Sequence, residues 1–352
     1  MNHDPVRFGL VGAGAIAQSY ALAFDSCSLA RVVAVADARP QAAAALARRL
    51  KCKPFNAYYE MAEQAELDAV LICTPPNTHA EICVEALERG VAVLCEKPLS
   101  IDVPSAQRMI ETSRNTGVKM TMASKFRFVQ DVVLAKALVT SGILGDIVLI
   151  ENVFTSRVDM SKRWNSDPSI SGGGVLIDNG THSVDLIRYF LGPLAEIHVV
   201  EGKRGRDLPV EETVHVFVRS TSGVLGTVDL SWSINKELDS YLRIYGSEGT
   251  ISVGWKDSRF LLSGSRDWHV FGKGYDKVQA FRSQIENFAC ALCGEETLLL
   301  SPEDALASVQ VIEAAYASLR DSHWIPIPLC SGSHPTSGTS ARLGLDQPPT
   351  CH

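Results

Sequence analysis

The sequence predicts an α/β protein of two domains, an N-terminal doubly wound parallel sheet and then an α+β domain with a large, mostly antiparallel open sheet. Its 352 residues exceed what one hydrophobic core usually holds. As far as residue 124, short apolar runs typical of buried strands alternate with helical segments, which is the pattern of a parallel sheet. From about Gly145, longer runs with a period of two follow one another between turns. We therefore place the first domain at 1–124, the second at 125–328 and a flexible tail rich in Ser, Gly, Thr and Pro at 329–352.

Composition and charge narrow the class of protein. A hydrophobic content of 46% with 21% charged residues is typical of a soluble globular chain. A net charge of −7 argues against nucleic acid as a partner, and no apolar run reaches the roughly 18 residues of a membrane span, so we expect no membrane partner either. The N-terminus leads straight into a strand without a signal peptide, and the nine cysteines are scattered mostly through apolar runs. We expect a cytoplasmic protein with reduced cysteines and no metal site.

The first strand is followed by a glycine-rich turn. Residues 6–11 read as a buried strand, and Gly12-Ala-Gly14-Ala15-Ile16-Ala17 opens a helix that runs to residue 24. This is the G-x-G-x-x-A pattern of dinucleotide-binding Rossmann domains, in which the first glycine permits the turn and the second lets the backbone approach a pyrophosphate. The free N–H groups at the start of the helix would face the phosphates. The sequence therefore predicts a dinucleotide site here.

The end of the second strand distinguishes NAD from NADP. Residues 31–36 form this strand and Asp37, Ala38 and Arg39 follow it. An acidic residue at this place hydrogen-bonds the ribose hydroxyls of NAD and would repel the additional phosphate of NADP. Arg39 could instead pair with that phosphate, and Asp37 could merely cap the next helix. We predict NAD as the cofactor, with NADP as the alternative.

Two further strand ends carry polar or charged residues. Residues 69–73 form a buried strand that ends in Thr74-Pro75-Pro-Asn77, and Thr78-His79-Ala-Glu81 is a capping box that opens the next helix. The strand at 91–95 delivers Glu96 and Lys97 before Pro98, and charged groups are costly to bury unless they are paired or used. The peptide bond before Pro98 could be cis, which would aim Lys97 out of the sheet. Because parallel strands end at one edge of the sheet, we expect these residues to border the cofactor: Thr74, Pro75, Asn77, His79, Glu96 and Lys97.

The second domain contains one segment that stands apart from its strands. Three glycines at 172–174 permit close approach of another group, and Asp178, His182 and Asp185 follow at a spacing of i, i+4 and i+7. On a helix all three would share one face, and a carboxylate one turn from an imidazole can orient it. A structural role for His182 is the alternative, but the neighbouring acids favour catalysis. A later helix at 302–320 could pack back on the first domain.

With these residues in place, the chain resembles the glucose–fructose oxidoreductase / inositol dehydrogenase / MocA-like (Gfo/Idh/MocA) family. Four motifs match in order over roughly residues 6–325: the glycine turn at 12–17, the Thr-Pro-Pro-Asn turn with its histidine, Glu-Lys-Pro at 96–98, and the glycine run with its Asp, Gly, His and Asp. The resemblance implies oxidation or reduction of a sugar or cyclitol hydroxyl, with Lys97, Asp178 and His182 as the catalytic group. It also implies a homo-oligomer, a dimer or tetramer, formed through the antiparallel sheet. Asn179 is a less usual choice within the family's Asp-x-Gly-x-His pattern.

Our hypothesis is an NAD-dependent dehydrogenase that oxidises a secondary ring hydroxyl. His182 would remove the hydroxyl proton, Asp178 would hold its ring, and Lys97 would stabilise the developing alkoxide. The substrate would be a hexose, free, nucleotide-linked or attached to an aminoglycoside, and the keto product could precede a transamination. The alternatives are an inositol or cyclitol dehydrogenase, an NAD-dependent glycosidase that oxidises its substrate transiently, and a nucleotide-sensing protein without catalysis. The candidate substrate contacts are Lys125, Arg127, Arg163, Trp164 and Asn179.

Overall fold

The computed structural model describes residues 4–161 and 163–328, so the predicted tail lies outside the described residues. The first domain is a six-stranded parallel sheet, sheet A, in the order β3-β2-β1-β4-β5-β6. The chain order reverses between β1 and β4, and ligands bind at such a switch point, beyond the carboxyl ends of the strands. The parallel doubly wound sheet is as predicted. Its strands are β1 (Val6–Val11), β2 (Ala30–Ala36), β3 (Lys53–Phe55), β4 (Ala69–Ile72), β5 (Ala92–Glu96) and β6 (Met120–Ala123).

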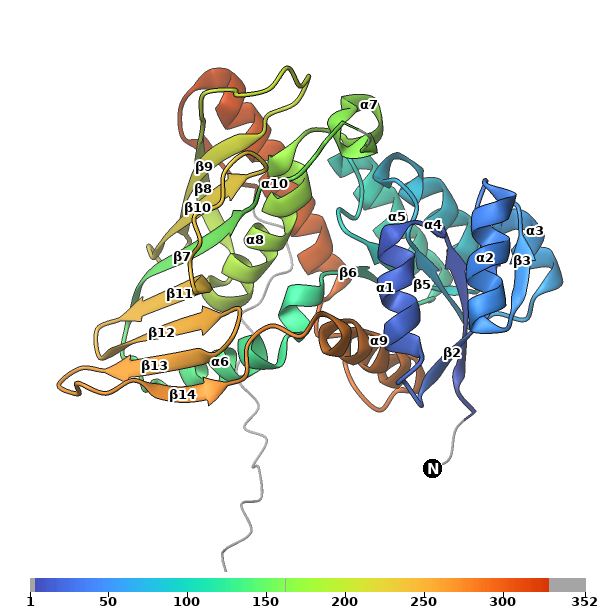
Figure 1. The fold of residues 1–352 in the computed structure, drawn as a ribbon, viewed down its shortest axis with the longest axis horizontal. Coiled ribbons are helices and arrows are strands. Elements are labelled where there is room, and N and C mark those ends of the chain that lie inside the picture. The colour runs from blue at the N-terminus through green and yellow to red at the C-terminus, as the bar shows by residue number, and fades with distance from the viewer. Residues whose placement is uncertain (1–3, 162, 329–352) are drawn as a thin grey trace, which may run out of the picture.

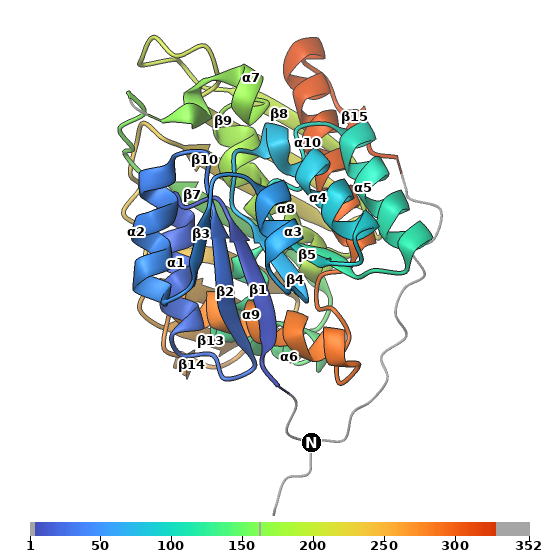
Figure 2. The same ribbon diagram turned by 90° about the vertical axis from the view of Figure 1, so that its right-hand side faces the viewer.

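Helices cover both faces of sheet A (Figure 2). The first face packs on α1 (Ala15–Phe24), α2 (Pro40–Leu50) and α9 (Lys277–Cys293), with Phe8, Tyr20 and Phe281 in one core. The second face packs on α3 (Tyr58–Gln64), α4 (His79–Glu88) and α5 (Val103–Thr116). Helix α9 comes from the C-terminal part of the chain, so the layer that holds the first domain together draws on residues far beyond 124.

The second domain is built on a nine-stranded sheet, sheet B, in the order β14-β13-β12-β11-β7-β10-β9-β8-β15. All neighbouring strands are antiparallel except β7 and β10, which run parallel. The large, mostly antiparallel sheet confirms the predicted class, and β14 and β15 are strands that the sequence patterns did not indicate. The strands are β7 (Ile147–Thr155), β8 (Leu194–Glu201), β9 (Thr213–Ser220), β10 (Leu225–Ser231), β11 (Ser240–Gly246), β12 (Gly249–Gly254), β13 (Ser258–Leu262), β14 (His269–Gly272) and β15 (Ile325–Pro326).

Three helices cover one face of sheet B: α6 (Gln130–Thr140), α8 (Val175–Leu191) and α10 (Pro302–Asp321). Helices α8 and α10 lie between this sheet and sheet A (Figure 1). The start of α10 joins the core of sheet A through Ala305 and Val309, and its middle joins the core of sheet B through Val311 and Ile312. The opposite face of sheet B carries exposed apolar side chains such as Val200 and Leu225. Among the described residues no helix has the length and apolar character needed to span a membrane.

Candidate active site

The glycine turn leaves the first turn of α1 open. Gly12 has a φ of +97°, and a Cβ there would lie 2.8 Å from the carbonyl carbon of Cys73, so only glycine fits between β1 and β4. Gly14 precedes α1, and a Cβ there would meet no atom within 4 Å. No side chain caps this helix, and Ala15 is exposed while Ile16 is half-buried. Unpaired N–H groups at an open helix start are what a pyrophosphate requires, so these residues fit a dinucleotide.

Asp37 is tied to the glycine turn. Its Oδ2 accepts a 2.7 Å hydrogen bond from the Ala13 amide, and its Oδ1 accepts one of 2.8 Å from the Arg39 amide. The Arg39 guanidinium, itself exposed as Ala38 is, folds back onto the same carboxylate at 3.1 Å. Burial opposes ionisation of Asp37, but the hydrogen bonds from Arg39 and Ala13 outweigh it and lower the pKa. A negative charge therefore stands at the end of β2, where a ribose would lie.

His79 joins the turns that follow β4 and β5. Its Nε2 lies 2.9 Å from the carbonyl oxygen of Thr74, and its Nδ1 lies 3.0 Å from that of Pro98. The ring is buried and each nitrogen faces one of the two turns, so His79 packs between them. Thr74 and Pro75 are half-buried and Asn77 is exposed. As anticipated, the bond between Lys97 and Pro98 is cis.

Glu96 is locked inside the first domain. Its Oε1 accepts a 2.6 Å hydrogen bond from the Tyr20 hydroxyl, which in turn accepts one of 2.8 Å from Gln284 Nε2. Its Oε2 accepts the Lys97 amide at 3.1 Å. This buried chain runs from α9 through α1 to the end of β5 and fixes the backbone that carries Lys97. Tyr20 and Gln284 were missed by the sequence analysis, because both lie within apolar helical stripes.

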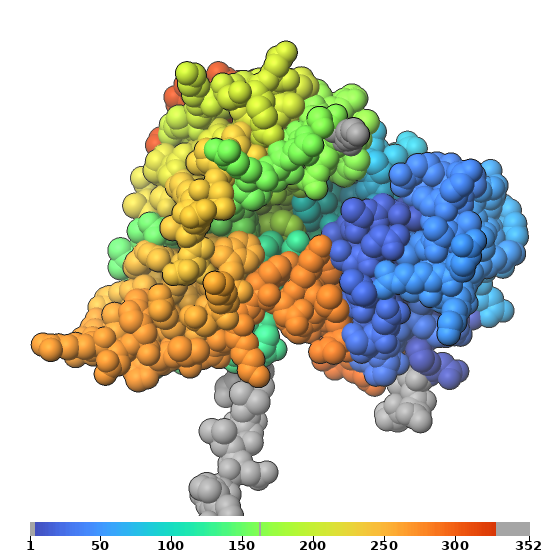
Figure 3. Space-filling model, in the orientation of Figure 1, coloured from blue at the N-terminus to red at the C-terminus, as the bar shows by residue number. Residues whose placement is uncertain are grey.

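Lys97 reaches across to α8. Its Nζ donates to Asp178 Oδ1 at 2.6 Å and to the Asp178 carbonyl oxygen at 3.0 Å. Both side chains are partly exposed, at 16% and 19%. The strand end of one domain and the helix of the other thus supply adjacent groups. Figure 3 shows the surface hollowed between the blue first domain and the yellow and orange parts of the second.

His182 lies one helical turn beyond Asp178 and is 7% exposed. Its Nδ1 is buried and has no hydrogen-bond partner among the described residues, so the expected bond from Asp178 to this ring is not made. The reason is that Lys97 takes the Asp178 carboxylate. Burial lowers the His182 pKa well below its usual range, and the nearby charges of Lys97 and Lys125 lower it further. The imidazole is therefore neutral and able to accept a proton.

Lys125 adds a second amine to the site. It begins the short helix η2 (Lys125–Phe128) after β6, and its ammonium lies 5.2 Å from the ring centre of Phe126. Burial and the charge of Lys97 lower its pKa to about 8, so at neutral pH it is still mostly protonated.

An aromatic cluster extends from His182 to the surface. The Phe126 ring meets the His182 ring edge-on with 5.0 Å between centres, and stacks on Tyr275 at 5.3 Å. Trp255 lies 5.5 Å from Tyr275 and is 40% exposed. We call this set, with Phe154 and Tyr241, the aromatic wall.

The other candidate substrate contacts are placed differently. Asn179 is half-buried beside Asp178 on α8, and the exposed residues Arg163 and Trp164 lie at the start of the short helix η3 (Trp164–Ser166). Arg127 is buried against Asp185 and Asp304 and does not line the open part of the site. Within the described residues no group of three or more His, Cys, Asp or Glu side chains could hold a metal ion.

A buried acid, Glu211, caps the start of α8 at the glycine run. Glu211 Oε1 accepts the Gly174 amide at 2.9 Å, the Leu176 amide at 3.0 Å and the Tyr316 hydroxyl at 2.8 Å. A Cβ on Gly173 would overlap the Tyr316 hydroxyl, which explains a glycine there. A negative charge at a helix N-terminus is favourable. The only signal in the sequence was a pair of acids directly before a strand.

A parallel sheet with an open glycine turn and an acid after its second strand, facing a Lys–Asp pair and a neutral histidine, defines a nicotinamide-nucleotide-dependent oxidoreductase. Two family models match the chain: "Oxidoreductase family, NAD-binding Rossmann fold" over residues 6–124 and "GFO/IDH/MocA C-terminal domain" over 132–252. The chain belongs to the Gfo/Idh/MocA family of oxidoreductases, and its first domain is an NAD-binding Rossmann domain.

Similar proteins include inositol 2-dehydrogenase of Rhizobium meliloti, 28% identical over 92% of this chain and 99% of that protein. The rhizopine catabolism protein MocA of Rhizobium meliloti is 27% identical over 88% and 93%. A solved structure of levoglucosan dehydrogenase in complex with NADH and levoglucosan covers 92% of this chain and 99% of its own, with a TM-score of 0.85 and 21% identity. At that identity the structural match supports the fold alone.

Proposed function

We propose that this protein is an NAD-dependent dehydrogenase that oxidises a secondary ring hydroxyl of a sugar or cyclitol. The observation that carries the proposal is the 2.6 Å contact between Lys97 and Asp178 beside the neutral ring of His182. It brings a hydrogen-bond donor and a proton acceptor from two domains to the edge of the nucleotide sheet. A secondary alcohol needs both groups when it loses a hydride and a proton.

The cofactor would lie along the strand ends, held by the first turn of α1 from Gly12 to Ile16 and by Asp37, with Thr74, Pro75 and Asn77 along its edge. When bound, NAD supplies the acceptor for the hydride. Because Asp37 already engages Arg39, that guanidinium is not free to bind the additional phosphate of NADP. We therefore propose NAD as the preferred form.

The protein's own groups would act on the substrate hydroxyl in sequence. His182 accepts its proton through Nε2, since Nδ1 is buried away from the site. Lys97, which Asp178 holds in place before the substrate binds, donates a hydrogen bond to the same oxygen. Such proton transfer contributes about 10²–10⁴-fold to the rate. The second amine, Lys125, would hold another oxygen of the ring, and the aromatic wall would pack against its C–H face.

Between the two substrate classes, we propose a hexose first. The exposed segment with Arg163 and Trp164 would suit a larger, nucleotide-linked or glycosidic group beyond the ring. A keto sugar is also what an aminotransferase consumes, so we propose amino-sugar formation as the setting. The cyclitol alternative is favoured by the similarity to inositol 2-dehydrogenase.

The test is NADH absorbance with NAD and a panel of free hexoses, inositols, nucleotide sugars and aminoglycosides. We expect steady NADH formation with one class, lost by at least about 10²-fold in Lys97→Met and His182→Ala. A matched control is His269→Ala, at an exposed position on an edge strand, which should retain the rate. Retained turnover in Lys97→Met would refute the assignment. NAD binding without any NADH release across the panel would favour the transient-oxidation glycosidase or the sensor.

A further inference from the structure

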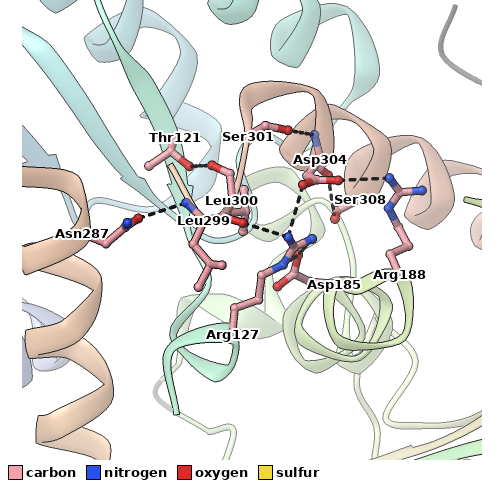
Figure 4. Close-up of polar contacts among 10 residues, drawn as sticks. All are labelled: Thr121, Arg127, Asp185, Arg188, Asn287, Leu299, Leu300, Ser301, Asp304 and Ser308. Atoms are coloured by element: carbon pink, nitrogen blue, oxygen red, sulfur yellow. Dashed lines mark hydrogen bonds and ion pairs between the residues drawn. The ribbon is translucent and has the colours of Figure 1, made fainter. Parts of the chain in front are cut away.

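Helix α8 makes a second ion pair with the chain that leaves the first domain. Asp185 follows Asp178 by seven residues, which places it two turns along the same face of the helix. Its Oδ1 accepts a hydrogen bond from Arg127 Nε at 2.8 Å and forms an ion pair with Nη2 at 2.7 Å (Figure 4). The side chains are 3% and 0% exposed, so the pair is sealed from water.

Arg127 joins three segments that are distant in the sequence. It lies in η2, two residues after Lys125. Its Nη1 donates to the Leu299 carbonyl oxygen at 3.3 Å and to Asp304 Oδ2 at 3.2 Å. Asp304 belongs to the first turn of α10 and also meets Arg188 at 3.4 Å. One guanidinium therefore links the exit of sheet A, the helix that carries His182 and the start of α10.

The ion pairs of Asp178 and Asp185 differ in one respect that matters for catalysis. Lys97 and Asp178 are partly exposed, because a substrate must reach them. Arg127 and Asp185 are sealed, and no substrate can displace either one. A sealed pair is seldom the most stable way to fill a core, which suggests that it is retained for the geometry it imposes.

We propose that Asp185 and Arg127 are positioning residues that hold α8 in place while Lys97 exchanges Asp178 for the substrate hydroxyl. Asp185 is three residues from His182, about 4.5 Å along the helix axis, so a displacement at one reaches the other. A misplacement of 1 Å can cost about 10²-fold in rate. The inference rests on the proposed function in one respect, namely that a substrate hydroxyl replaces Asp178 as the partner of Lys97. The anchoring of His182 by Asp185 can be measured without any substrate.

The experiment compares Asp185→Asn with Asp304→Asn. Both remove one carboxylate from the same guanidinium. Asp304→Asn also removes the 3.4 Å contact with Arg188 on α8, but only Asp185→Asn removes an acid one helical turn from His182. We expect Asp185→Asn to lower kcat by about 10²-fold with the NAD dissociation constant unchanged in calorimetry. We expect Asp304→Asn to stay within about threefold of the parent, a difference of under about 1 kcal/mol.

A second measurement needs no substrate. Histidine ring carbons are labelled and titrated by NMR, with the His182 signal assigned from His182→Gln. In the parent the ring should stay neutral, because it is buried and faces the charges of Lys97 and Lys125. In Asp185→Asn a loosened helix lets water reach the ring, and its titration should move toward the ordinary imidazole value. Asp304→Asn should titrate like the parent.

Equal losses of kcat in the two variants, or an unchanged His182 titration in Asp185→Asn, would overturn the proposal. If Asp185→Asn does not fold, Asp185→Glu replaces it, since it keeps the charge and lengthens the link by one methylene. We then expect about a tenfold loss of kcat at nearly parental Tm, and full activity would contradict the role. If the parent protein is inactive on every substrate but the His182 titration shifts as expected in Asp185→Asn, the proposed function is wrong. The positioning role of Asp185 would still be supported.

Discussion

The buried chain from Gln284 through Tyr20 to Glu96 can be tested by removing one oxygen. In Tyr20→Phe, Glu96 loses a 2.6 Å hydrogen bond and the Gln284 amide loses its 2.8 Å acceptor. A bond to a charged group contributes about 1.5–3 kcal/mol and a buried unpaired donor costs about 1–3 kcal/mol. The free energy of unfolding should fall by about 3 kcal/mol, which corresponds to roughly 6–12 °C in Tm.

The effect should depend on pH, and its sign follows from Glu96. Burial raises the pKa of this carboxyl above its ordinary 4.5, and the Tyr20 bond acts in the opposite direction. A carboxyl with a raised folded-state pKa binds its proton more tightly in the folded protein. Stability is therefore lost as the pH rises from the unfolded pKa through the folded one. Without Tyr20 the folded pKa rises further, so the Tm deficit of Tyr20→Phe should be smaller at pH 5 than at pH 8.

The assay is calorimetric Tm between pH 5 and 8, and Tyr58→Phe is the matched control. The Tyr58 hydroxyl is also buried in the first domain but has no hydrogen-bond partner among the described residues. Its removal should leave Tm unchanged or raise it slightly. Equal losses in the two variants, or a deficit that does not vary with pH, would refute the reasoning.

Three further outcomes are expected. Asp37→Ser should weaken the binding of NAD by about tenfold in calorimetry and improve the binding of NADP relative to NAD, because it removes an acceptor for the ribose hydroxyls and a charge that repels the additional phosphate. An unchanged preference for NAD would contradict this. Glu211→Ala should lower the free energy of unfolding by about 3 kcal/mol, because it leaves two backbone amides unpaired, whereas Tyr316→Phe should lower it by about 1 kcal/mol. The reverse order in denaturant melts would contradict the role of Glu211 as the cap of α8. Leu225→Lys on the open face of sheet B should convert an oligomer to monomers in light scattering, whereas Val133→Lys on α6 should not. A parent protein that is already monomeric would contradict this prediction.

Much of the fold could be predicted because its signals are local. The alternation of strands and helices in the first domain, and the change of period after Gly145, need only neighbouring residues to be recognised. The glycine turn and the charges of Asp37 and Lys97 at strand ends follow the same logic, since parallel strands deliver their ends to one edge. The approach of Lys97 to Asp178 across the two domains follows from no such pattern, because only the family resemblance grouped these two residues.

The remaining contacts depend on tertiary structure that no local pattern encodes. Glu211 caps α8 from 37 residues away, and Gln284 reaches Tyr20 across 264 residues. Helix α9 packs on sheet A although it comes from the C-terminal part of the chain, and an apolar stripe on a helix does not say which sheet the helix covers. The strands β14 and β15 were missed because they are short edge strands, at which neither hydrophobic alternation nor length is required.

The acids of α8 show that helical spacing predicts which residues share a face but not which partners they bind. Their spacing placed Asp178, His182 and Asp185 on one face, and in the structure both acids do turn toward the exit of the first domain. The period could not say which cation each acid would meet. Asp178 binds Lys97 in the open part of the site, and Asp185 binds Arg127 in the sealed part. Neither acid makes a hydrogen bond to the buried Nδ1 of the imidazole, so the basicity of His182 is set by burial and by two lysines, and not by an acid partner. A helix that is fixed by a sealed pair on one side of its histidine and carries an exchangeable pair on the other is suited to a site in which a lysine changes partners while the base stays in place.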